Sequence, residues 1–263
     1  MKILNGAELA GFIKERQARE AAGFKRKPCL LIIRDSDNPV ILKYVRLKIR
    51  YGEDIGVKVL DYKASDTDDI ARRIKEANAD PEIDGMILQL PILDAERTDE
   101  LTGLIAPEKD VDGLSQASNY NSATATAILW LLAGYDIDLK GRKVALVGRG
   151  KLVGAPLLKI LTDSGVAVEM FHRGSDLTKL KDFDIIISAT GKAGLILSDY
   201  VSSGVVIVDA GTASEGGVLK GDVADEVRER RDIAAITPVI GGVGPLTVTC
   251  LFEHVLLAYN KKK

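Results

Sequence analysis

The feature that most restricts the fold is a strand, a glycine-rich turn and a helix in immediate succession. Residues 143–147 form an apolar run that leads into Gly148, Gly150 and Gly154, and residues 155–163 have a helical pattern. Positions without side chains let the backbone approach a pyrophosphate, and the positive end of the following helix then faces the anion. A tight turn without a ligand is the alternative, but the flanking strands favour a nucleotide-binding turn.

The rest of the chain alternates short apolar strands with amphipathic helices, which indicates an α/β protein with parallel sheets. In the first half we predict strands at 29–33, 57–60 and 85–90 and helices at 8–22, 40–51 and 68–78. The turn-rich segment 110–122 is the candidate connection to a second domain, after which a helix is expected at 124–133. Further strands at 166–171, 184–188 and 205–208 complete a doubly wound, Rossmann-type domain, and a last helix covers 247–259.

Charge and cysteine content exclude several classes of protein. The 36 Lys and Arg residues nearly balance the 38 Asp and Glu residues, which argues against binding of nucleic acid or of an anionic membrane surface. No apolar run approaches the roughly 20 residues that cross a bilayer, and the N-terminus lacks a signal-peptide pattern. Cys29 and Cys250 are expected to be reduced core thiols, which suggests a cytoplasmic protein. His172 and His254 lack partners at ligand spacing, so no metal site is expected, and His254 is interpreted as a boundary residue of the last helix.

Basic residues near the glycine turn bear on the choice of cofactor. An NAD-binding domain usually has an acidic residue at the end of the second strand, whereas this chain has His172 and Arg173 there. With Arg149 in the turn itself, these bases favour the 2′-phosphate of NADP. Solvated surface charges are the alternative, and NAD is the less favoured cofactor.

Four polar residues in the first half could converge on one site. Tyr44 and Lys48 are four residues apart in a helical pattern and so project from the same face. Gln89 ends an apolar strand and Asp112 lies in a turn, which is where open α/β sheets place ligand-binding groups. Tyr44 and Lys48 alone could be an ordinary surface pair, but the two further sites favour a binding role.

Four motifs occur in an order and spacing that cover nearly the whole chain. They are YVRLK at 44–48, DGMILQLP at 84–91, KDVDG at 109–113 and TPVIGGVGPLT at 237–247. In these motifs the chain resembles the bifunctional methylenetetrahydrofolate dehydrogenase/cyclohydrolase family. The resemblance implies a folate-binding domain at 1–121, joined by a C-terminal helix at 246–263 that returns to it, a Rossmann-type NADP-binding domain at 122–245, and a homodimer.

The resemblance also implies roles for individual residues. Lys48 is similar to the family's catalytic lysine, Tyr44 to the residue that packs on the folate ring, Gln89 to the polar partner of the lysine, and Asp112 to the group that anchors the pterin. Further implied substrate-binding residues are Pro91, Gly244 and Pro245. The implied cofactor-binding residues are Gly148, Arg149, Gly150, Arg173, Ser175 and Thr212.

The implied activities are NADP-dependent oxidation of 5,10-methylenetetrahydrofolate and hydrolysis of the methenyl product to 10-formyltetrahydrofolate. The chain departs from the family pattern at Ile41 and Gly150, where the family has Ser, at Ile240, where it has Pro, and in a short connector at 114–121. The alternatives are therefore a cyclohydrolase without dehydrogenase activity, an NAD-linked dehydrogenase, or a catalytically silent binding protein.

Overall fold

The computed structural model describes residues 1–215 and 218–262 and divides into two compact units. The small-sheet unit comprises residues 11–123 and 248–263, and the large-sheet unit comprises residues 1–10 and 124–247. Residues 216–217 of the predicted segment 122–245, and residue 263 of the predicted segment 246–263, lie outside the described residues.

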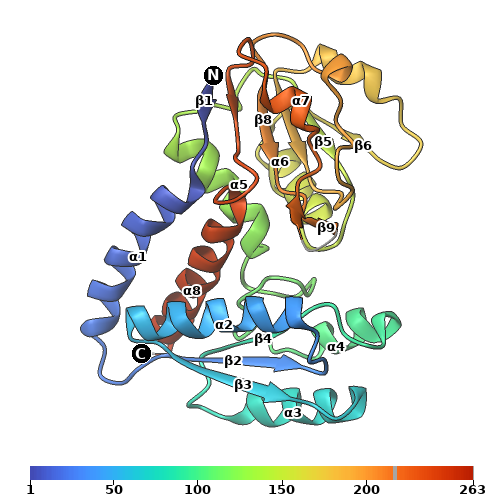
Figure 1. The fold of residues 1–263 in the computed structure, drawn as a ribbon. Coiled ribbons are helices and arrows are strands. Elements are labelled where there is room, and N and C mark those ends of the chain that lie inside the picture. Colours follow the sequence, from blue (N-terminus) through green and yellow to red (C-terminus); the bar gives the residue numbers. More distant parts are fainter. Residues whose placement is uncertain (216–217, 263) are drawn as a thin grey trace. The chain divides into compact units, whose positions relative to one another are not determined.

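The small-sheet unit is built on three parallel strands in the order β3-β2-β4. Its elements are β2 (Cys29–Arg34), α2 (Pro39–Ile55), β3 (Lys58–Lys63), α3 (Thr67–Ala79), β4 (Gly85–Leu88), the 3-10 turn η1 (Ala95–Arg97) and α4 (Thr98–Gly103). Helices α2 and α3 cover opposite faces of the sheet (Figure 1). Both faces of β2 are therefore buried, which is why its sequence is a continuous apolar run.

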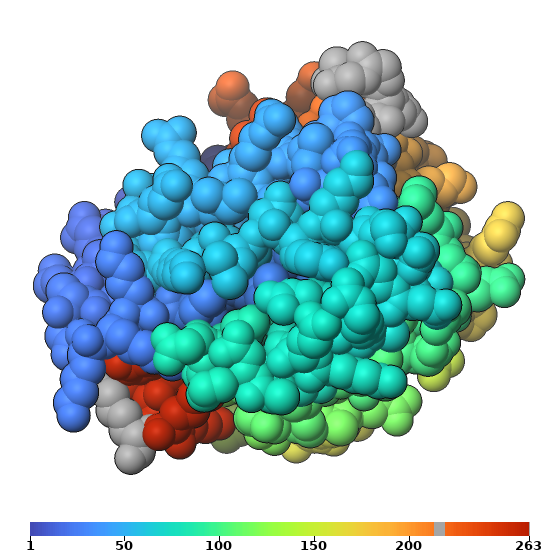
Figure 2. Space-filling view, turned by 90° about the horizontal axis from the view of Figure 1, so that it is seen from below, coloured from blue at the N-terminus to red at the C-terminus, as the bar shows by residue number. Residues whose placement is uncertain are grey.

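Local sequence signals set the ends of α2 and α3. Asn38 caps α2 by accepting a hydrogen bond from the backbone N–H of Val40 at 2.9 Å, and Gly56, with a φ of 78°, ends the helix. Asp66 caps α3 through the N–H of Asp69 at 2.8 Å. The inner side of α3 packs on the sheet, whereas its charged outer side forms part of the surface seen in Figure 2.

The large-sheet unit contains six parallel strands in the order β1-β11-β8-β7-β5-β6. Its strands are β1 (Lys2–Ile3), β5 (Val144–Val147), β6 (Val168–Phe171), β7 (Ile185–Ser188), β8 (Val206–Asp209) and β11 (Ala235–Ile236), with a separate antiparallel pair β9 (Ala213–Glu215) and β10 (Val218–Lys220). Its helical segments are α5 (Ala123–Gly134), α6 (Gly154–Asp163), η2 (Leu177–Asp182), η3 (Ser198–Tyr200) and α7 (Asp225–Arg228). After β5 the chain places β6 on one side and β7 on the other, so the strand order reverses at β5. Ligands of doubly wound sheets bind outside the carboxyl ends of the strands at such a switch point.

Two long helices belong to both units. Helix α1 (Gly6–Ala22) and helix α8 (Val243–Lys261) each begin in the large-sheet unit and end in the small-sheet unit. Within the small-sheet unit the two helices are joined by a hydrogen bond from Gln17 Nε2 to the carbonyl of Thr249, at 3.0 Å. The predicted α/β class, with two parallel-sheet units and a C-terminal helix, is confirmed.

The elements that sequence patterns missed are short. Strands β1 and β11 have two residues each and pair with one another, so neither has room for a periodic pattern. No helix among the described residues has both the length and the apolar character needed to cross a membrane.

Candidate functional site

Lys48 and Gln89 meet at the carboxyl end of the small sheet. Lys48 lies on α2, and its Nζ donates a hydrogen bond to Gln89 Oε1 at 2.8 Å. Gln89 directly follows β4; its backbone N–H bonds to the carbonyl of Ile33, and its side-chain Nε2 donates to the carbonyl of Leu90 at 3.0 Å. The second bond turns the amide so that its oxygen faces the lysine.

Burial shifts the pKa values of two ionisable groups at this site. It lowers the pKa of Lys48, and the negative charge of Asp112 partly offsets that effect. Burial likewise raises the pKa of Asp112 to about 6, against the opposing effect of Lys48. The two groups therefore interact electrostatically, and within the described part of the chain the Asp112 carboxylate has no hydrogen-bond partner. A lysine and a carboxylate are thus both held in a setting that disfavours their charged forms.

The turn that carries Asp112 is fixed by its neighbours in the 109–113 motif. Lys109 Nζ donates to three backbone carbonyls at the end of α3, those of Ala77, Asn78 and Asp80, at 2.6–2.9 Å. Asp110 accepts hydrogen bonds from two N–H groups of the same turn, those of Gly113 and Ser115. Gly113 has a φ of +69°, and a Cβ there would come within 2.4 Å of the Asn121 carbonyl oxygen. The other residues of the motif thus hold the turn, which leaves the Asp112 carboxylate available to a ligand.

The remaining predicted folate-site residues fall in both units. Tyr44 lies one helical turn before Lys48 on α2 and is 39% exposed, so its ring is accessible. Pro91 is exposed and follows Gln89 by two residues. Gly244 and Pro245 form the first turn of α8 and belong to the large-sheet unit.

The glycine-rich turn follows β5 at the switch point of the large sheet. Gly148 has a φ of +104°, and a Cβ there would lie 2.6 Å from the carbonyl oxygen of Ala189, so no other residue fits without strain. A Cβ at Gly154 would lie 1.8 Å from the carbonyl oxygen of Gly148. Gly150 differs, because nothing lies within 4 Å of its Cβ position. The first and third glycines of the pattern shape the turn, whereas the second leaves open space.

Arg149 and Arg173 occupy equivalent positions on neighbouring strands. Val147 of β5 is the register partner of Phe171 of β6, and each arginine lies two residues beyond that pair. The strands are parallel, so both arginines follow carboxyl ends at the same edge of the sheet, and both are exposed. Ser175 closes the turn after β6 by accepting a hydrogen bond from the N–H of His172 at 3.0 Å.

Two buried aspartates that the sequence patterns did not identify support the neighbouring loops. Asp222 accepts hydrogen bonds from Ser188 Oγ at 2.5 Å and from the N–H groups of Thr190 and Lys192. Asp209 accepts one from the N–H of Gly211, next to the exposed Thr212. The hydrogen bonds to Asp222 are at the end of β7, and the bond to Asp209 is at the end of β8. Both strands end at the same edge of the sheet as the glycine turn. Because the three partners of Asp222 lie 30–34 positions earlier in the chain, no motif reveals its role.

One predicted role needs correction. His254 is only 7% exposed and its Nδ1 lies 2.8 Å from the carbonyl oxygen of Val111, so it is a core residue and not a boundary residue. The helix pattern misplaces it because the α8 segment is covered by the loop that precedes α5. Cys29 and Cys250 are both buried thiols that form no disulfide in the described part of the chain, as predicted.

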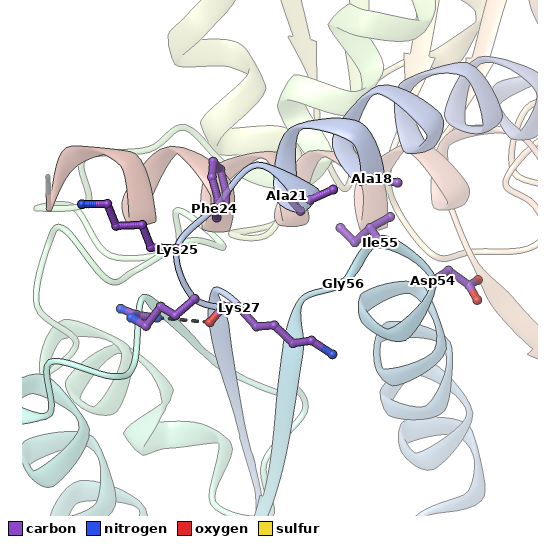
Figure 3. Close-up of a pocket in the computed structure, with 10 residues that line it drawn as sticks. Ala18, Ala21, Phe24, Lys25, Lys27, Asp54, Ile55 and Gly56 are labelled. Carbon is purple, nitrogen blue, oxygen red and sulfur yellow. Dashed lines mark hydrogen bonds between the residues drawn. The ribbon is translucent and has the colours of Figure 1, made fainter.

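A groove of about 450 Å³ lies elsewhere in the small-sheet unit (Figure 3). It is bordered by the ends of α1 and α2 and by the segment that enters β2, including Phe24, Lys27 and Gly56. These residues are at the amino end of the parallel strands, whereas Gln89 follows the carboxyl end of β4. The groove is therefore separate from the site of Lys48.

Together, the folds and sites define an α/β enzyme with a partly buried lysine in one unit and a dinucleotide-binding edge in the other. Comparison with known proteins identifies it further. Residues 4–112 match the family model of the tetrahydrofolate dehydrogenase/cyclohydrolase catalytic domain, and residues 122–263 match that of the NAD(P)-binding domain of the same family. The chain belongs to the tetrahydrofolate dehydrogenase/cyclohydrolase family.

Individual relatives are similar over their full lengths. In an alignment of 280 positions, the chain is 37% identical to the bifunctional protein FolD of Macrococcus caseolyticus. The alignment covers 99% of this chain and 98% of the relative. The crystal structure of FolD from Campylobacter jejuni superposes with a TM-score of 0.95 at 31% identity and complete coverage of both chains. A Trypanosoma brucei FolD complexed with NADP cofactor and an inhibitor has a TM-score of 0.90 at 26% identity, covering 99% of this chain and 97% of that one.

Proposed function

We propose that this protein oxidises 5,10-methylenetetrahydrofolate with NADP and hydrolyses the resulting 5,10-methenyltetrahydrofolate to 10-formyltetrahydrofolate. The observation that carries the proposal is the partly buried Lys48, bonded to Gln89 and electrostatically coupled to Asp112. We assign the folate site to residues 1–121 with 246–263 and the cofactor site to residues 122–245.

The hydrolysis requires water to attack an amidinium-like carbon and protons to move between water, a ring nitrogen and the protein. Lys48 is suited to carry these protons, because burial increases the fraction of the amine that is neutral near pH 7. Gln89 fixes the direction of the lysine Nζ. Asp112 would anchor the pterin through its carboxylate, and the exposed ring of Tyr44 would pack against the folate.

The residues at the carboxyl edge of the large sheet fit NADP. Gly148 provides the sharp turn, Gly150 leaves open space beside the backbone, and two arginines follow adjacent strands where a phosphate could pair with both. Ser175 and Thr212 lie on loops at the same edge and would contribute further contacts. When bound, NADP supplies the hydride acceptor for the oxidation, while the protein contributes binding and orientation.

The deciding experiment follows the absorbance of methenyltetrahydrofolate with and without the purified protein. We expect the protein to accelerate the loss of this absorbance even when no nucleotide is present. In a second assay, methylenetetrahydrofolate should reduce NADP faster than NAD. A protein that binds both compounds and turns over neither would contradict the proposal and favour the catalytically silent alternative.

The two arginines should determine the preference for NADP. Changing Arg149 and Arg173 together to Ser is expected to weaken NADP binding by about 10- to 100-fold, because two charge-assisted hydrogen bonds to the 2′-phosphate are lost. Binding of NAD, titrated in parallel, should stay the same. Arg142→Ser is the matched control, because that exposed arginine precedes β5 at the opposite edge of the sheet. Equal losses for NAD and NADP would refute a specific role in 2′-phosphate recognition.

Gly150 offers a gain-of-function test. Gly150→Ser restores the hydroxyl that the family pattern places in the turn, and the open space around the Cβ position accommodates it. We expect NADP to bind a few-fold tighter, on the order of one net hydrogen bond, by titration calorimetry. Gly148→Ser is the contrasting variant, because its positive φ and close carbonyl should abolish the gain. Unchanged affinity in Gly150→Ser would show that the turn does not contact the phosphates.

We also propose a cytoplasmic homodimer that supplies formyl groups for purine biosynthesis. The cytoplasmic setting is supported by the buried thiols of Cys29 and Cys250, which form no disulfide in the residues that the structure describes.

A further inference from the structure

His254 connects α8 to the turn that carries Asp112. Its Nδ1 is 2.8 Å from the carbonyl oxygen of Val111, the residue directly before Asp112. The imidazole is buried and stacks on the ring of Tyr120, with 4.9 Å between centroids and an interplanar angle of 29°. The contact spans 143 positions of sequence and lies entirely within the small-sheet unit.

The partners of the ring determine its tautomer. A carbonyl oxygen can only accept a hydrogen bond, so Nδ1 must carry the proton. Nε2 is then an acceptor in the neutral ring, and the Cys250 sulfur lies 3.7 Å from it. The thiol is one helical turn earlier on α8 and can donate to that nitrogen.

The surroundings keep the ring neutral. Burial lowers the pKa of His254, which outweighs the hydrogen bond to Val111 and the nearby charges of Glu253 and Asp110, both of which raise it. Lys261 acts in the same direction as burial, and its ammonium lies over the ring of Tyr120 at 4.9 Å. The Nδ1–H donor is therefore present throughout the neutral pH range.

We propose that His254 is a positioning residue for the folate site: through the Val111 carbonyl it fixes the turn from which Asp112 reaches the pterin. Two further contacts hold Val111 besides the bond from His254. Its side chain lies over Gly85 of β4, where an added Cβ would come within 2.6 Å of the valine. Its N–H donates a hydrogen bond to the Lys109 carbonyl. Asp110, also in the turn, accepts hydrogen bonds through its carboxylate and its carbonyl from groups at 113–118, and its N–H donates to the carbonyl of Ala106. His254 thus anchors that local structure to α8. This inference rests on the proposed function, since it assigns Asp112 to folate binding.

Two substitutions of His254 distinguish the effect of the N–H donor from the effect of ring packing. His254→Phe keeps an aromatic ring against Tyr120 but leaves the Val111 carbonyl without its donor. We expect the KM for methenyltetrahydrofolate to rise about tenfold, with kcat within about twofold, because a buried carbonyl left unpaired allows the turn to shift. His254→Asn supplies an N–H in place of Nδ1–H, and we expect its KM to stay within about threefold of the native value. NADP affinity should be unchanged in both, since the glycine turn belongs to the other unit.

Either of two kinetic results would overturn the proposal. An unchanged KM in folded His254→Phe would show that the turn needs no anchor on α8. Equal increases of KM in the Phe and Asn variants would show that ring packing matters and the donor does not.

A measurement on the native protein covers the case in which the Phe variant does not fold. The chain has only two histidines, so nitrogen-15 NMR of histidine-labelled protein gives two ring signals, assigned through His172→Gln. We expect His254 to be protonated at Nδ1 and not at Nε2 at pH 7.5, whereas the opposite tautomer overturns its role. An inactive native protein would instead overturn the proposed function, and the tautomer measurement would still report on the contact with Val111.

Discussion

Replacing Lys48 with Met is expected to lower the rate of methenyltetrahydrofolate hydrolysis about a thousandfold, within the range of roughly 10²–10⁴ that positioned proton-transfer groups contribute. Methionine has a similar length and no exchangeable proton, so it removes the chemistry and retains most of the packing. Stability should not fall, because burial already disfavours the charged amine at this position. The measurement is the decay of methenyl absorbance, with circular dichroism to confirm folding.

Two controls make this result specific. Lys43→Met removes an exposed lysine from the same helix, five residues earlier, and should leave the rate unchanged. Titration of NADP should give the same affinity in Lys48→Met and in the native protein, because the glycine turn lies in the large-sheet unit. A variant that hydrolyses at the native rate would remove Lys48 from the mechanism.

The residue patterns identified the components of this site, whereas the contact between Lys48 and Gln89 was implied only by the family resemblance. The spacing of Tyr44 and Lys48 placed them on one helical face, and the apolar strand placed Gln89 at a carboxyl end. Whether Lys48 reaches Gln89 depends on the in-register pairing of β2 with β4 and on how α2 lies over the sheet. Both follow from packing of whole elements, which a local pattern does not contain.

The limits of pattern analysis also appear in individual glycines. Three glycines form one motif, yet only Gly148 and Gly154 are required by backbone conformation or by close approach. The sequence cannot separate them, because φ and the position of the Ala189 carbonyl exist only in the folded chain. The role of His254 was missed for a similar reason, since its partner is a backbone carbonyl that any residue at position 111 would present.

Asp112→Asn should expose a conflict between stability and function. Folding raises the pKa of Asp112 from 3.8 to about 6, so the folded state disfavours the ionised carboxylate. This penalty is absent only well below pH 3.8, where the group is protonated in both states, grows between the two pKa values, and is nearly complete above pH 6. Asparagine cannot ionise and avoids it.

We therefore expect Asp112→Asn to raise the free energy of unfolding by about 2 kcal/mol at pH 7.5, the shift being discounted for the partial solvent access of the side chain. The gain should fall to a small fraction of that value at pH 4, as measured by thermal unfolding followed by circular dichroism. At the same time the KM for methenyltetrahydrofolate should rise by about 10- to 100-fold, because a hydrogen bond to a charged group is lost.

Asp94→Asn, an exposed aspartate in the same unit, is the matched control and should change neither quantity. A stability gain that persists undiminished at pH 4 would show that the amide stabilises the turn by its own hydrogen bonds and not by removing a partly buried charge. A stabilised variant with native KM would show that Asp112 does not bind the substrate. The combination of higher stability and weaker folate binding would mean that the protein retains a destabilising carboxylate because the substrate requires it.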